Sequence, residues 1–252
     1  MRKTLICALA IAAAAAMSAA ALAGGDGEKP VVVRSGNVIL TLNGNASPTA
    51  LPRHELAPIS FHASGRIGTA DGAHPPALAE VVLDTGKAGA IEADDFPSCA
   101  RNRIEATTTE EAERRCPGAI VGRGRTEGEI AFPESAPFDA RGPLVLFNGG
   151  RRRKEFLLYI HAYVPVPAPT AIIVPVVTTK IHRGPYRLHA VSKIPTVAGG
   201  AGSVTYFQLN INRPGYLMAN CDNGHFSAYV EADFAEGTKI EGSFERPCRP
   251  IG

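Results

Sequence analysis

The chain has 252 residues, 45% of them hydrophobic, with 26 Lys and Arg against 24 Asp and Glu and a formal net charge of +2. This near balance excludes the strong overall basic field with which proteins bind nucleic acid or anionic membrane surfaces nonspecifically. The length suffices for one large β domain or two small ones, and no internal repeat of the kind that builds solenoids or propellers is evident.

The N-terminal residues 1–23 have the parts of a secretory signal. Two basic residues precede an apolar stretch at 5–16, and Ala-Leu-Ala at 21–23 is a small-x-small cleavage site. A membrane anchor is the competing interpretation, but the stretch is short and rich in alanine for a spanning helix. We therefore predict export, followed by a flexible leader at 24–30, and expect no membrane-spanning segment after cleavage. The processed chain would be neutral, with 24 basic and 24 acidic residues.

Four cysteines follow the predicted signal: Cys99, Cys116, Cys221 and Cys248. An even number of cysteines in an exported chain predicts disulfides, and four cysteines allow three pairings. We favour Cys99–Cys116 and Cys221–Cys248, because each of these pairs flanks a short supersecondary unit. A zinc site is the alternative, although the chain has no Cys-x-x-Cys spacing and export disfavours it.

The first part of the chain reads as extended segments interrupted by prolines. Segments with the β-branched or alternating apolar residues of strands lie at 31–33, 38–42, 59–63 and 79–83. His54-Glu55 resembles the start of a metalloprotease helix motif, but Pro58 occupies the place of the second metal-binding histidine. Because the surrounding prolines also exclude a helix, we do not expect a metal site there.

The clearest helical pattern lies between the first two cysteines. Thr108 and Glu111 have the spacing of a capping box, acidic residues lie at the start of the helix, and two arginines lie at its end. Pro117 then stops the helix. Two turns of helix are not stable alone in water. We therefore predict a short helix in a loop that the Cys99–Cys116 disulfide closes and that packs against the sheet.

The second half of the chain reads as a series of strands. The Gly-x-Gly at 122–124 lacks the sequence context of a nucleotide-binding loop, so we interpret it as strand glycines at a bend or bulge. The clearest hairpin has strands at 144–147 and 155–164 and a predicted turn at 148–150, Asn-Gly-Gly. Alternate residues at 226–234 are apolar and face one way, and the last two cysteines lie just outside this final hairpin.

The dense run of charge is Arg151, Arg152, Arg153 and Lys154. We interpret it as the tip of the hairpin that spans 144–164, where basic side chains stay in solvent and hinder the association of strand edges. The alternative stays open: a loop that binds phosphate, an acidic glycan or a lipid headgroup. Under this alternative the run is the candidate anion-binding loop of the chain and would make weak contact with an anionic polymer or glycan.

Sequence motifs of catalysis are missing. The chain has no Gly-x-Ser-x-Gly nucleophile elbow, and its seven histidines show no tight metal-ligand spacing. Paired carboxylates for glycoside cleavage stay open, because their geometry is spatial rather than sequential. We expect no cofactor, no metal and no catalytic residue. The first hypothesis is a non-catalytic envelope or extracellular protein, structural or ligand-binding; the alternative is a secreted hydrolase acting on glycans or cell-wall polymer.

Several segments carry a resemblance to a known group of proteins. They are Leu-Pro-Arg-His-Glu-Leu-Ala-Pro-Ile (51–59), Pro-Pro-Ala-Leu (75–78), Pro-Ser-Cys (97–99), Cys-Pro-Gly-Ala-Ile-Val-Gly-Arg-Gly (116–124), Phe-Asn-Gly (147–149) and the terminal pair of cysteines. In these segments the chain resembles uncharacterised exported proteins of actinobacteria. The resemblance implies an extracytoplasmic, β-rich domain with disulfides, and it brings no catalytic residues.

These patterns together predict one domain over residues 31–252. Its fold class is mainly β: an antiparallel β-sandwich, jelly-roll-like or immunoglobulin-like, with one short helix in a disulfide-closed loop. Its predicted location is secreted or extracytoplasmic.

Overall fold

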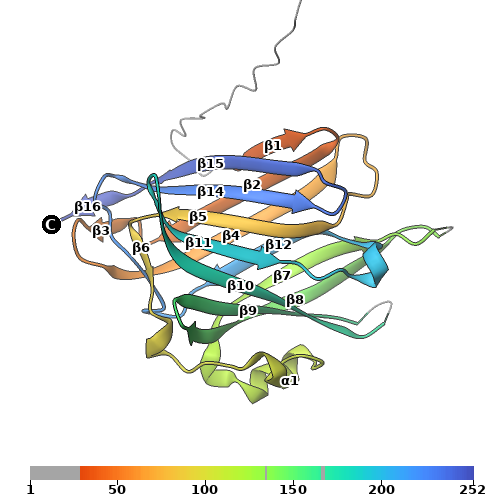
Figure 1. Cartoon of the computed structure of the whole chain (residues 1–252), viewed down its shortest axis with the longest axis horizontal. Helices are drawn as coiled ribbons and strands as arrows, with labels where there is room; N and C mark the ends of the chain where they lie inside the picture. The colour runs from red at the N-terminus through yellow and green to blue at the C-terminus, as the bar shows by residue number, and fades with distance from the viewer. Residues whose placement is uncertain (1–28, 134, 166–167) are drawn as a thin grey trace, which may run out of the picture.

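The computed structural model describes residues 29–133, 135–165 and 168–252 (Figure 1). The predicted signal at 1–23 and most of the leader at 24–30 lie outside these residues. Strands hold 62% of the described residues and helices 9%, which confirms the predicted mainly-β, antiparallel fold with one short α-helix.

Fourteen strands of the described chain form one sheet, and two further strands pair separately. The strands are β1 (Val31–Ser35), β2 (Val38–Ser47), β3 (Ala50–Pro52), β4 (Ala57–Thr69), β5 (Leu78–Gly86), β6 (Gly89–Ile91), β7 (Ile120–Ile130), β8 (Phe138–Arg152), β9 (Glu155–Val164), β10 (Thr170–Arg183), β11 (Tyr186–Lys193), β12 (Gly202–Ile211), β13 (Leu217–Ala219), β14 (His225–Phe234), β15 (Lys239–Pro247) and β16 (Arg249–Ile251). The helical elements are η1 (Ala93–Asp95), η2 (Arg101–Arg103), α1 (Thr109–Arg115), η3 (Pro117–Ala119) and η4 (Ala198–Gly200).

The main sheet is one path in the order β1-β2-β4-β12-β7-β8-β9-β10-β11-β5-β14-β15. Sheets of more than about ten strands tend to curl, and this one turns back until its two end strands meet. Cγ2 of Val33 in β1 lies 3.3 Å from the position that a Cβ on Gly242 in β15 would take. Arg246 of β15 spans the seam further along, where it donates to the Gly44 carbonyl (2.8 Å) and to Asn43 Oδ1 (3.2 Å) of β2. The sheet is a nearly closed barrel.

The prediction of a mainly β, antiparallel fold is therefore confirmed, but the sheet is not clearly a sandwich. The two halves of the path face each other as sandwich layers do (Figure 1). However, β8 and β9 join the halves by an antiparallel ladder that runs, with one register shift, from Leu144↔Ala162 to Arg152↔Glu155. Residues alternate between inside and outside in a sandwich and in a barrel alike. The alternation in the sequence thus does not distinguish the two architectures, whereas the strand order does.

One end of the barrel interior is filled with apolar side chains. They are Val38, Leu40, Ile67, Leu78, Ala232, Phe234 and Ile240, each at most 8% exposed. We call this cluster the filled end; it lies where a turn joins β14 to β15, toward the right of Figure 1. Its members on β14 belong to the alternating apolar set predicted to face one way.

The disulfide-closed segment, residues 99–116, covers the outer face of β8, β9 and β10. Its buried residues Cys99, Ile104, Ala112 and Cys116 pack in one cluster with Val145, Phe147 and Ile173. The disulfide has a Cα–Cα distance of 5.8 Å. Thr108 caps α1 as predicted, its hydroxyl accepting from the Glu111 N–H at 3.3 Å. We call this segment the outer cover; because of it, β8 is buried on both faces.

The second disulfide, Cys221–Cys248, also has the predicted pairing, with a Cα–Cα distance of 6.0 Å. It joins the two open ends of the β14–β15 hairpin. Leu51 and Ala219 pack against it in a buried cluster, next to the short parallel pair of β3 and β16. This disulfide thus secures the end of the molecule opposite the filled end.

The turn predicted at residues 148–150 is wrong. Strand β8 continues to Arg152, and the chain reverses at Arg153 and Lys154. The register shifts between Asn148 and Gly150, which makes a β-bulge, and Gly150 has a φ of 76°. The Asn148 side chain is fully buried, and its Nδ2 donates to the Ala93 carbonyl at 2.9 Å. Residues typical of turns therefore serve here to bend a strand and to hold η1 against it.

Candidate functional site

The end of the barrel opposite the filled end is hollow. A cavity of about 250 Å³ lies there, lined by residues from β2, β4, β5, β9, β10, β11, β12, β14 and β15 and by the crossing strands β6 and β13. Its lining is mostly apolar and contains many small residues. These are Gly44, Ala46, Gly86, Ala88, Gly89, Ala90, Ala190, Ala219 and Ala228.

Strands β6 and β13 close part of this hollow end. β13 pairs with β4, Leu217 opposite Ile59, and on its other side with β6, Leu217 opposite Ile91. In the described sheet β6 pairs with β13 alone. The free edge of β6 leaves an opening between it and the inner wall of the barrel.

A second, polar recess of about 270 Å³ occupies this opening. It shares Gly89, Ala90, Ile91 and Leu188 with the lining of the cavity. Its further lining residues are Glu92, Asp94, Arg151, Phe156, Lys180 and Arg187. We call this recess the mouth. Three of its side chains are basic and two are acidic.

The bulge in β8 brings Arg151 to the mouth. Leu146 pairs with Ile160 before the bulge, and continuing that register would place Gly150 opposite Phe156. The extra residue places Arg151 opposite Phe156 instead. The Arg151 guanidinium lies 5.0 Å from the centroid of the Phe156 ring, and its Nη1 donates to Asp94 Oδ2 at 2.9 Å.

The predicted anion-binding run is therefore divided. Arg151 lines the mouth, whereas Arg152 ends β8 and Arg153 and Lys154 form the exposed turn beyond it. The hairpin tip was predicted correctly. The other basic residues that line the mouth, Lys180 on β10 and Arg187 on β11, were missed, because strand pairing rather than sequence proximity brings them there.

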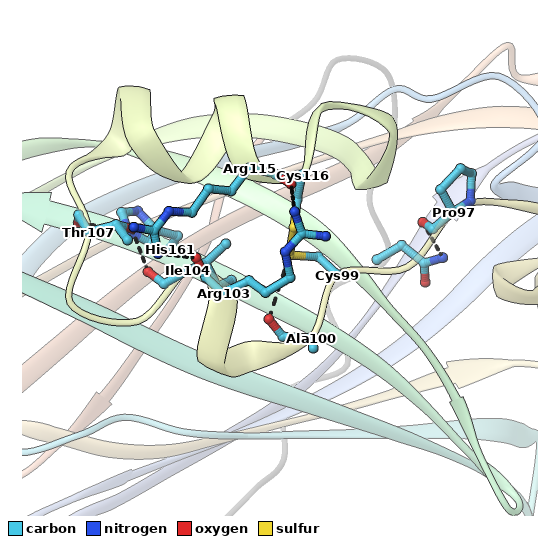
Figure 2. Close-up of a disulfide and its surroundings, with 10 residues drawn as sticks. Pro97, Cys99, Ala100, Arg103, Ile104, Thr107, Arg115, Cys116 and His161 are labelled. Carbon is cyan, nitrogen blue, oxygen red and sulfur yellow. Dashed lines mark hydrogen bonds between the residues drawn. A yellow bond between two sulfur atoms is a disulfide. The ribbon is translucent and has the colours of Figure 1, made fainter.

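His161 lies under the outer cover and has a structural environment. It is fully buried, and its Nε2 is 3.3 Å from both Oγ1 and the carbonyl oxygen of Thr107 (Figure 2). The Phe147 ring meets the His161 ring edge-on. Burial lowers the pKa of His161, which keeps the ring neutral.

A second set of polar residues has the distances of a catalytic triad. Ser203 Oγ lies 3.1 Å from His74 Nε2, and His74 Nδ1 lies 2.5 Å from Glu129 Oε1. In a working triad the serine passes its proton to the histidine and is open to substrate. Here the Ser203 hydroxyl donates to the Pro75 carbonyl at 2.5 Å, and the residue is only 5% exposed. The set therefore fastens the 74–75 segment to β12.

A carboxylate–histidine pair lies on the outer face of the barrel. Asp84 is fully buried; its Oδ1 lies 2.6 Å from His189 Nδ1, and its Oδ2 lies 3.7 Å from Arg183 Nη1. Leu83 and Thr85, its neighbours on β5, line the cavity, so Asp84 points away from it. The pair ties β5 to β11 from outside and does not take part in the cavity or its mouth.

No group of three or more His, Cys, Asp or Glu side chains within residues 29–133, 135–165 and 168–252 is arranged to hold a metal ion. None of the helices in this part of the chain is both long enough and apolar enough to cross a lipid bilayer. Comparisons of the chain with protein-family models, with curated proteins and with solved structures gave no match.

Proposed function

We propose that this protein is a non-catalytic binding protein that holds a small apolar molecule in the hollow end of its barrel. The observation that carries the proposal is the cavity of about 250 Å³ with its mostly apolar lining. Ligand pockets are typically apolar with a few polar groups and range upward from about 300 Å³, which favours a small occupant. Water is a poor occupant of such a space, because it needs several polar partners.

The polar groups of the lining support an orienting role rather than chemistry. Thr85 and Thr178 supply hydroxyl groups to the cavity wall. Tyr216 is buried, which raises its pKa, and its hydroxyl donates to Asn148 Oδ1 at 3.4 Å. Arg246 is already bound to the β2 backbone across the seam. The lining thus offers a few hydroxyls to a ligand and no activated nucleophile.

The location that goes with this function is outside the cytoplasm, in the cell envelope or the medium. The two disulfides support it, because disulfides persist in oxidising compartments. Export through a signal at residues 1–23 and kinship with exported actinobacterial proteins remain parts of this proposal.

The test is calorimetric titration of the disulfide-bonded protein with decanol, an uncharged chain. We expect saturable binding that Ala190→Phe abolishes, because a ring at this position would occupy the cavity. Val191→Phe is the matched control, since the next residue of β11 faces outward. Absence of decanol binding, or equal binding by the two variants, would refute the proposed function.

A hydrolase acting on glycans or cell-wall polymer is the second candidate function. The observation in its favour is the triad-like set of Ser203, His74 and Glu129. If the protein is a non-catalytic binding protein, Ser203→Ala should not change the rate at which a purified sample hydrolyses acetylated or unmodified glycans. Loss of a measurable activity in that variant, with an unaltered unfolding midpoint, would favour the hydrolase instead.

A further inference from the structure

The mouth continues the inner wall of the cavity without interruption. Three strands each carry one lining residue of the mouth and one of the cavity at neighbouring inward positions: Phe156 and Leu158 on β9, Lys180 and Thr178 on β10, and Leu188 and Ala190 on β11. Inward residues of a strand are two positions apart. A molecule lying along these strands therefore meets apolar groups in the cavity and charged groups at the mouth.

The charges at the mouth leave a cationic excess. Arg151 is paired with Asp94, and Glu92 is the second acidic residue. Arg187 donates from Nη1 to the carbonyls of its own turn, at 2.9 Å to Gly184 and 2.7 Å to Tyr186, which keeps its guanidinium in place.

Lys180 is exposed, and in the part of the chain that the structure describes it has neither an ion-pair nor a hydrogen-bond partner. The mouth thus presents one uncommitted ammonium group beside two guanidinium groups that are already held in position.

We propose that the ligand is a single-chain amphiphile with an anionic head, its chain in the cavity and its head at the mouth beside Lys180, Arg187 and Arg151. This inference rests on the proposed function and narrows its ligand class. The cavity of about 250 Å³ suits one chain. A carboxylate or a phosphate would receive charge-assisted hydrogen bonds at the mouth, whereas an uncharged head would leave Lys180 without a counterion.

The first experiment compares decanoate, decyl phosphate and decanol as ligands of the same disulfide-bonded protein at mildly alkaline pH and low salt. We expect decanoate and decyl phosphate to bind about tenfold more tightly than decanol, the factor that corresponds to one charge-assisted contact. The more tightly bound of the two anions identifies the class of head. Affinity should rise about fourfold per added methylene until the cavity is full, and added salt should reduce the advantage of the anions.

The second experiment removes the charge at the mouth. The double variant Lys180→Gln, Arg187→Gln should bind decanoate about tenfold more weakly, close to decanol, and should bind decanol as the parent does. The matched control is the double variant Lys193→Gln, Arg141→Gln. It also removes one lysine and one arginine, but away from the mouth, at the end of β11 and near the start of β8. Urea unfolding of both double variants shows whether the fold is intact.

The outcomes separate the two proposals. Equal affinity for decanoate and decanol, or an unchanged decanoate affinity in the mouth variant, overturns the anionic head while decanol binding still supports the cavity. An equal loss in the control variant overturns it as well, because the effect would then come from overall charge. If decanol does not bind, the proposed function itself fails, and the inference that rests on it fails as well.

Discussion

The two ends of the barrel are built from the same strands and differ in the size of their inward side chains. Strand β14 gives Phe234 and Ala232 to the filled end and Ala228 and Phe226 to the hollow end, all on one face. At the filled end the facing strand β4 supplies Ile67, and the neighbouring strand β15 supplies Ile240. At the hollow end many of the lining positions are glycine or alanine, and a cavity of about 250 Å³ remains between the strands.

This difference shows how a cavity can exist without loss of the fold. Protein interiors are close-packed, and voids are few. Here the close packing of the filled end and of the outer cover holds the sheet, and Cys221–Cys248 secures the hollow end covalently. The hollow end can therefore keep small side chains, and substitutions at the two ends should have unequal effects.

The largest expected effect comes from truncating one phenylalanine at each end. Phe234→Ala should cost about 3–5 kcal/mol, because Phe234 is only 3% exposed in a packed cluster. Phe226→Ala should cost less than about 2 kcal/mol, because its ring already borders empty space. Urea unfolding of the two variants measures both values. Equal losses would contradict the distinction between a packed and a hollow end.

Removal of the disulfides should separate stability from binding. Replacing both cysteines of either pair by serine should cost about 3 kcal/mol, since the bridges close comparable loops, with sequence separations of 17 and 27. Loss of Cys221–Cys248 should also weaken decanol binding, because Ala219 packs against this bridge and lines the cavity. Loss of Cys99–Cys116 should leave binding intact. Titration of the two variants with decanol checks this expectation. Weaker binding without Cys99–Cys116, and intact binding without Cys221–Cys248, would show that the outer cover shapes the cavity.

Enlarging two alanines of β14 tests the comparison in the other direction. Ala232→Leu at the filled end should destabilise the protein by about 1–3 kcal/mol through overpacking. Ala228→Leu should be neutral or stabilising, because the new side chain enters the cavity, and it should reduce decanol affinity. Thermal unfolding and titration of both variants decide the matter; a loss of stability in Ala228→Leu would mean that the cavity is not free space.

The smallest expected effect concerns the outer cover, which belongs to neither end. Burial lowers the pKa of His161 in the folded protein below the usual value of about 6.5. The unfolded chain therefore binds a proton at higher pH than the folded one, so this contribution to stability is present above about pH 6.5 and is lost as the pH falls below it.

Urea unfolding across this pH range checks the slope, which should be smaller in His161→Gln. The exposed His54→Gln is the control and should keep the parent slope. If the free energy of unfolding depends on pH equally in the parent and in His161→Gln, His161 is not the source of that pH dependence.

Local patterns in the sequence predicted what depends on near neighbours. The Thr108 cap, the alternation along β14 and both cysteine pairings follow from residue spacing within one supersecondary unit, and the structure has all three. The strand glycines at 122–124 were also interpreted correctly. A Cβ on Gly124 would lie 1.9 Å from the Gln208 carbonyl oxygen, so the close approach of β12 requires glycine there.

The tertiary structure decided what depends on distant parts of the chain. Asn148 and Gly150 resemble turn residues by type, but burial of the Asn148 amide against the carbonyls around η1 makes them a bulge. That bulge places Arg151 beside Lys180 and Arg187, and the strand order leaves one end of the barrel hollow. Sequence periodicity specifies which face of a strand is apolar. It does not specify which strands face each other or whether their side chains fill the space between them, because both depend on pairing between distant segments.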